Sequence, residues 1–295
     1  MSAKAAIPEA LKADLPQTKW GKILSTTPVV MTVIATLLAG LSSGEMIRAQ
    51  YDRSLAAQQQ SKAGDQWGYF QAKRLRAALQ RSTLDVIRTT AKVYPLDPKL
   101  FPPSSASQPG LDSLANGTLP PTAPEPVLAE PIAAVVAAMD AGQPDDAVAA
   151  LLKSVKKTEV AEALAAANAH VRAFDAALRP ITTEIDALEK HISPVIVPSF
   201  VAARLTYSAQ RYDAESHQNQ VIAQLLEIQV RQSNASAERH HNRSQFFFYG
   251  MLAAQLAVII STLSMAVQKR NLLWAIAAAA GVFAFAFAVY VYLFV

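Results

Sequence analysis

Residues 246–295 read FFFYGMLAAQLAVIISTLSMAVQKRNLLWAIAAAAGVFAFAFAVYVYLFV and decide the fold. Two apolar runs, 246–267 and 272–295, contain no charged side chain and are separated by the turn QKRN at 268–271. Each run reaches the roughly 20 residues that an α-helix needs to cross a bilayer core about 30 Å thick. A third such run fills 23–44, where the absence of a small-residue cleavage site favours a retained signal anchor. The sequence therefore predicts three transmembrane helices.

The charged residues indicate an orientation. The chain has 295 residues and a net charge of +4, and all of this excess lies in residues 1–22 and in the turn 268–271. Short segments rich in Lys and Arg stay in the cytoplasm, so we expect the tail 1–22 and the turn 268–271 to be cytoplasmic. Segment 45–245 would then be periplasmic, and the protein would lie in the inner (plasma) membrane of a bacterium. Arg48 and Arg243 also flank the spans, which leaves the opposite orientation as the alternative. The sequence pI of about 9.2 thus indicates topology and no nucleic-acid partner.

Proline divides the segment between the first two spans. Ten of the chain's 17 prolines fall in residues 95–131, which predicts a Pro-rich loop unable to sustain a helix. The flanking residues 45–94 and 199–245 carry apolar side chains at helical spacing, which predicts a long antiparallel stalk of the coiled-coil type. Residues 132–198 are Ala-rich and predict a small membrane-distal helical cap, broken at Gly142, Pro144, Pro180 and Pro194. The fold class is an all-α membrane protein.

Signatures of catalysis and cofactor binding are missing from the sequence. The chain has no Cys, which excludes disulfides, iron–sulfur clusters and thiol catalysis. The spacing of its ten glycines permits neither G-x-G-x-x-G nor a Walker loop, and H-E-x-x-H and G-x-S-x-G are absent. We expect no enzyme, no cofactor and no small-molecule substrate; a hydrolase built from dispersed Ser, His and Asp residues is a remote alternative.

The histidines next to the second span are the one metal-like pattern. Glu238 and His241 form an E-x-x-H pair beside His240, but a di-iron bundle needs that motif twice. We interpret RHHNR as a collar at the level of the lipid headgroups and predict no metal site. Zinc bound by His240 and His241 across an oligomer axis is the alternative.

Small and amide side chains in the spans predict helix–helix contacts. Residues of this kind let helix backbones approach closely in lipid, within one chain or between chains. No ionisable residue enters a span, which argues against an ion pump. The predicted contact residues are Gly40, Gly44, Gln255, Ala280, Gly281 and Ala284.

Two segments resemble a known family. DQWGYFQAKRLRAAL (65–79), and YDAES (212–216) together with residues 239–281, resemble the bacterial membrane-protein family catalogued as domain-of-unknown-function family 4337. Its members share a DQW-x-Y-x-QAK motif after a first span and a His-bearing helix before a closing pair of spans. The resemblance implies this architecture and a bacterial origin, and it implies no catalytic residue.

The first of these segments also predicts an interaction surface. Trp67, Phe70 and Gln71 fall on one helical face, and Gly64 and Gly68 open a close-approach surface beside them. We expect this face to pack on the opposite leg of the stalk or on a neighbouring subunit. An exposed hot spot for another protein is the alternative.

These features together predict a non-enzymatic scaffold or accessory subunit. Besides the lipid bilayer, we expect its partners to be further copies of itself, in a homo-oligomer, or a larger membrane complex, contacted through the stalk and the spans. The alternative is a ligand-sensing or signal-transducing membrane protein. It would need a partner, because the expected cytoplasmic side is too small for an output domain.

Overall fold

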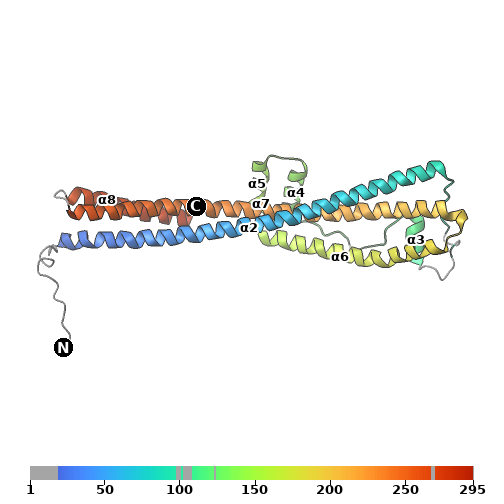
Figure 1. The fold of residues 1–295 in the computed structure, drawn as a ribbon, viewed down its shortest axis with the longest axis horizontal. Coiled ribbons are helices and arrows are strands. Elements are labelled where there is room, and N and C mark those ends of the chain that lie inside the picture. The colour runs from blue at the N-terminus through green and yellow to red at the C-terminus, as the bar shows by residue number, and fades with distance from the viewer. Residues whose placement is uncertain (1–18, 98–100, 102–107, 123, 267–269, 295) are drawn as a thin grey trace, which may run out of the picture. The chain divides into compact units, whose positions relative to one another are not determined.

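The computed structural model describes residues 19–97, 101, 108–122, 124–266 and 270–294. These residues form helices and no strand (Figure 1). Three of the helices, α2, α7 and α8, are long and apolar enough to cross a membrane. The described elements are α2 (Lys19–Thr90), α3 (Gln108–Asn116), α4 (Glu130–Asp140), α5 (Asp145–Leu152), α6 (Lys157–Leu188), the short 3-10 helices η2 (Glu189–His191) and η3 (Pro194–Ile196), α7 (Val197–Ala266) and α8 (Arg270–Phe294).

Two of the long helices join a predicted span to a predicted stalk leg. α2 runs through the predicted first span and first stalk leg and ends at Thr90, shortly before Pro95. Within it, Pro28 lacks the backbone N–H that would donate to the carbonyl four residues earlier, and the Thr32 hydroxyl donates to the Pro28 carbonyl, 2.8 Å away. α7 likewise joins the second leg to the second span. Most of the expected cytoplasmic tail and part of the turn 268–271 lie outside the described residues.

The chain forms two compact units, of which the first comprises Met1–Ser54 and Asn234–Val295. Its core is small, with Ala35, Leu38, Phe247, Ala254, Ala284 and Val291 buried together. Large apolar side chains such as Val29, Leu37 and Phe283 are instead more than half exposed. This outward-facing apolar surface is what helices in contact with lipid require.

The second unit, Leu55–Ser233, has two clusters of buried apolar side chains. One joins α4, α5 and α6 to Leu225 and Ile228 of α7; the other gathers α3 and the end of α6 around Phe200 and Tyr207. α6 lies beside α7 (Figure 1), held by hydrogen bonds from Arg211 to Thr182 and from Arg204 to Asp186. α2, α6 and α7 therefore pack together as the long helices of this unit.

Buried positions in this unit recur every seven residues. The interval of seven is the one at which helices keep the same face toward a partner when they wind around each other. Most of the side chains at these repeat positions on α2 and α7 are small, so these two helices can approach closely there. The repeats are Ala56, Ala63, Ala77 and Leu84 on α2, Ala202, Ala209, Ser216, Ala223 and Val230 on α7, and Val160, Ala167, Phe174, Ile181 and Leu188 on α6.

Two predictions about proline were wrong. α6 continues through Pro180, because Leu178 and Ile181 on either side are buried and their packing outweighs the lost backbone hydrogen bond. The Pro-rich loop contains α3, whose Pro109 lies in the first turn, where proline is tolerated. α3 buries Leu111 and Leu114 and is followed by Gly117 at a φ of 63°, a conformation that favours glycine.

The Ala-rich segment forms α4, α5 and α6, and its role as a membrane-distal cap stays a prediction. Within the second unit, α6 extends along α7, with bonds from Arg211 to Thr182 and from Arg204 to Asp186. The expected breaks at Gly142 and Pro144 do occur, between α4 and α5. Each Ala side chain buries little apolar area, but a helix rich in Ala can pack closely along a neighbouring helix over its whole length.

Candidate functional site

The candidate site is centred on Glu215 of α7, whose side chain is only 7% exposed. Lys73 of α2 donates to Glu215 Oε2, and the Nε of Arg211 donates to Oε1 at 2.6 Å. Lys73 ends the DQWGYFQAK motif and Glu215 lies in YDAES, so the two segments singled out in the sequence meet at this carboxylate. One buried anion is thus shared by two cations.

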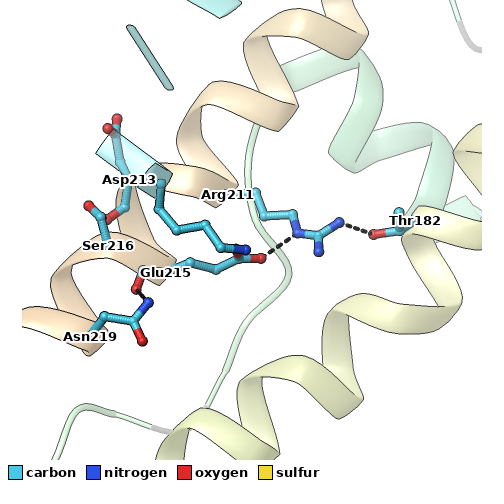
Figure 2. A network of polar contacts seen from close by, with 7 residues as sticks. Thr182, Arg211, Asp213, Glu215, Ser216 and Asn219 are labelled. Atoms are coloured by element: carbon cyan, nitrogen blue, oxygen red, sulfur yellow. Dashed lines mark hydrogen bonds and ion pairs between the residues drawn. The ribbon is translucent and has the colours of Figure 1, made fainter. Parts of the chain in front are cut away.

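Arg211 extends the network to a third helix (Figure 2). Its Nη1 donates to the Thr182 hydroxyl of α6 at 3.2 Å, and that hydroxyl donates to the Leu178 carbonyl at 3.0 Å. Burial by itself lowers the pKa of Arg211, but the hydrogen bond and charge of Glu215 outweigh it, and the net pKa is raised. The guanidinium is therefore held firmly in its charged form between α6 and α7.

Further contacts fix the YDAES segment around Glu215. The Asn219 amide donates to the Glu215 carbonyl at 2.7 Å, and the Ser216 hydroxyl donates to the Asp213 carbonyl at 2.7 Å (Figure 2). Asp213 accepts from Arg81, and the Lys73 Nζ lies 5.3 Å from the centre of the Tyr212 ring. α2 is therefore tied to α7 by several charged contacts in a row.

Tyr207 lies one turn before this cluster and is 2% exposed. Its hydroxyl makes no hydrogen bond of normal geometry with a described residue. Burial raises the pKa of Tyr207, while Thr182 and the charge of Arg211 act in the opposite direction. The phenol is thus kept neutral in the interior of the second unit.

The residues predicted at the DQW motif divide between two surfaces. Trp67 is partly buried, donates from Nε1 to Glu227 at 2.8 Å, and meets Phe70 edge-on with ring centres 5.4 Å apart. Gly64, Gly68 and Gln71 are exposed, and a Cβ added at either glycine would meet nothing within 4 Å. The structure therefore places the aromatic pair against α7 and leaves the glycine face open.

The predicted residues in the spans divide in the same way. Ala284 is fully buried, Ala280 is partly buried, and a Cβ at Gly281 would come within 2.1 Å of the Met31 side chain, so α8 and α2 approach closely there. A Cβ at Gly40 or Gly44 would meet nothing, and Gln255 is exposed. These last three residues take no part in a close contact within the described chain.

The histidine collar is engaged in pairwise contacts. His240 Nδ1 lies 2.5 Å from Glu45 Oε2, and His241 Nε2 lies 3.0 Å from the Gln245 amide. Glu238 is exposed. Across the described residues, no group of three or more His, Asp or Glu side chains is placed to hold a metal ion.

Polar side chains link α2 and α7 in both units, and the sequence did not predict these contacts. In the first unit, the hydroxyls of Ser42 and Ser244 each donate to the other residue's carbonyl, at 2.9 and 2.8 Å. In the second, the Gln59 amide donates to Gln229 and accepts from the Ser233 hydroxyl. The only sequence signal for these pairs was a seven-residue register built from small and polar side chains, which an apolar periodicity does not reveal.

The cluster around Glu215 is a network of paired charges. The central carboxylate is neutralised by two cations, and neither Glu215 nor Arg211 presents an activated nucleophile or a free general base. The cluster joins three helices and lines a cavity of about 530 Å³ together with Tyr69 and Lys73.

Comparison with known proteins finds a match only for the N-terminal part of the chain. No curated protein and no solved structure matches it. The YDAES segment and residues 239–281 lie beyond the one region that a family model matches. That region is residues 20–102, which match the family described as Domain of unknown function (DUF4337), and this confirms the resemblance carried by DQWGYFQAKRLRAAL.

Proposed function

We propose that the protein is a non-enzymatic scaffold or accessory subunit of a bacterial inner membrane that associates with a second copy of itself through α2. In this proposal α2 and α7 form an antiparallel stalk on the periplasmic side, with the Ala-rich helices packed along it. The observation that carries the proposal is an exposed apolar stripe on α2 that begins at the open glycines of the DQW motif.

The stripe follows one face of α2 for six turns. Leu75, Leu79 and Val86 are 62%, 57% and 57% exposed, and they continue the line of Gly64 and Gly68 at intervals of four and seven residues. Side chains at these intervals lie on the same side of a helix. Contiguous exposed apolar surface of this kind marks an interaction site more often than a single exposed Leu does.

A second copy fits the stripe for two reasons. Copies anchored in one membrane present α2 in the same direction, so their glycines meet and allow the two backbones to approach closely. Leu75 and Leu79 then pack on the same residues of the neighbour just beyond the crossing. A symmetric dimer is also the most common assembly of identical chains.

The absence of Cys makes a direct test possible. In membranes, Gln71→Cys should form a disulfide-linked dimer, because Gln71 lies on the stripe, whereas the exposed Lys62→Cys points about 180° away from Gln71 around the helix and should not. Gly68→Leu should reduce the dimer measured by light scattering in mild detergent. A monomer at all concentrations, together with equal cross-linking of both cysteine variants, would rule out this assembly.

A further inference from the structure

The cavity beside Glu215 is lined by residues of α2, α6 and α7, and all of these residues belong to the second unit. Its volume of about 530 Å³ falls in the range of sites that hold small molecules. Tyr69 and Lys73 of the DQW motif and Glu215 of YDAES line it, together with Arg179, Arg211 and Gln218. The residues that hold the three helices together therefore also form the wall of a cavity.

Gln218 places a hydrogen-bonding group in the wall of the cavity. The residue is 9% exposed and lines the cavity, and its side-chain amide makes no hydrogen bond to any residue that the structure describes. The polar atoms of this amide stay accessible from the cavity, so both its donor and its acceptor are available to a ligand there. A polar molecule in the cavity would supply the missing bonds.

The charges of the lining indicate the sign of that molecule. Three cations, Lys73, Arg179 and Arg211, face two carboxylates, Asp175 and Glu215. Lys73 and Arg211 both bind Glu215, which leaves this cluster with an excess of one positive charge. No carboxylate of the described residues lies within ion-pair distance of the exposed Arg179, so its guanidinium is free to bind an anion.

A second cavity, of about 360 Å³, also borders Gln218 but lacks these features. Its lining contains His170, His217 and Glu125 and no Lys or Arg, and His217 is already paired with Glu125 at 3.2 Å. The excess of positive charge therefore lies on the side of α7 that carries Glu215 and Arg211.

We propose that the cavity beside Glu215 binds a small organic carboxylate, held by the Arg179 guanidinium and by the amide of Gln218. A planar guanidinium matches the two oxygens of a carboxylate, and the amide donates to it or to a neighbouring oxygen of the ligand. Bound there, the ligand contacts α6 and α7 and lies against Tyr69 of α2, so that its binding stabilises the packing of the three helices.

Succinate and L-glutamate are the probes for this site, tested on the full chain purified in mild detergent. Calorimetry and thermal unfolding should show saturable binding of at least one of them, measured against sodium chloride of equal ionic strength and against the neutral succinamide. Arg179→Gln and Gln218→Leu should each weaken binding by about tenfold or more, since each removes a hydrogen-bonding group from the ligand.

Arg172→Gln is the matched control, because Arg172 is an exposed cation on the same helix that does not line this cavity. It should leave the dissociation constant unchanged. The proposal is overturned if neither succinate nor glutamate gives heat or a thermal shift beyond that of sodium chloride, or if Arg179→Gln binds as wild type does. These outcomes do not depend on self-association, which Gln71→Cys reports separately.

Discussion

At the scale of single residues, Glu215 is the carboxylate that links the three long helices of the second unit. It accepts from Lys73 of α2 and Arg211 of α7, and through Arg211 it is linked to Thr182 of α6. Two half-buried cations depend on this single carboxylate, so its removal leaves both without a counter-charge.

We therefore expect Glu215→Gln to lower the free energy of unfolding by about 2–4 kcal/mol, because breaking a buried charge cluster costs more than losing one hydrogen bond. Denaturant unfolding in detergent, followed by tryptophan fluorescence, measures the change. Glu227→Gln is the control: it alters one hydrogen bond to Trp67 and should cost about 1 kcal/mol or less. Equal effects of the two substitutions would contradict the central role of Glu215.

Tyr207 gives a pH-dependent prediction. Because burial raises its pKa in the folded chain, the unfolded chain ionises first as the pH rises, and the folded state loses relative stability above the ordinary tyrosine pKa. Below that pH the phenol is neutral in both states, and Tyr207→Phe should be nearly neutral or stabilising, because it removes a buried hydroxyl without a partner.

The stability difference between wild type and Tyr207→Phe should thus shift in favour of the variant from about pH 9 to about pH 11, as followed by thermal unfolding. The other ionisable groups are common to both proteins and cancel in the comparison. A difference that is flat over this range would mean that Tyr207 ionises in the folded chain as it does in the unfolded one.

At the scale of helices, the close seam of small residues is the distinctive feature. Ala56, Ala63 and Ala77 on α2, and Ala209 and Ala223 on α7, are nearly or completely buried. Alanine contributes little buried area, so the stability of this seam comes from close backbone approach and from the polar pairs at its edges. A large side chain in the seam would force the helices apart.

Neighbouring alanines on α2 allow a matched test. Ala77 is 0% exposed and Ala78 is exposed, although the two residues share the same helix and the same propensity. Ala77→Leu should destabilise the chain by about 1–3 kcal/mol through overpacking, whereas Ala78→Leu should change stability by no more than about 0.5 kcal/mol. Denaturant midpoints of both variants check this, and a tolerated Ala77→Leu would show that the helices have room to separate.

At the scale of the whole molecule, the proposed orientation in the membrane rests on the distribution of charge. The proposed periplasmic segment has no net charge, and the excess of Lys and Arg lies in the two short segments that we assign to the cytoplasm. A Cys introduced for Val127, which is 96% exposed, should react with a membrane-impermeant maleimide in intact cells. Lys22→Cys should react only after the cells are opened; the reverse pattern would invert the topology.

The sequence by itself determined the three candidate spans and the helical class. Both follow from local composition, because a bilayer requires about 20 consecutive apolar residues and a helix satisfies its own backbone. It also pointed to the DQW and YDAES segments, which contain Tyr69, Lys73 and Glu215 of the site. It emphasised Trp67, Phe70 and Gln71 instead, and it gave no indication of Arg211, Thr182 or Gln218.

Only the tertiary structure decided how these segments meet. Lys73 and Glu215 are 142 residues apart, and no local preference encodes such a pair. A seam of alanines produces little hydrophobic periodicity, so neither the register of α2 on α7 nor the course of α6 along α7 could be derived from apolar spacing. The same holds for α3 and Pro180, because burial of a few large side chains outweighed the local preference of proline.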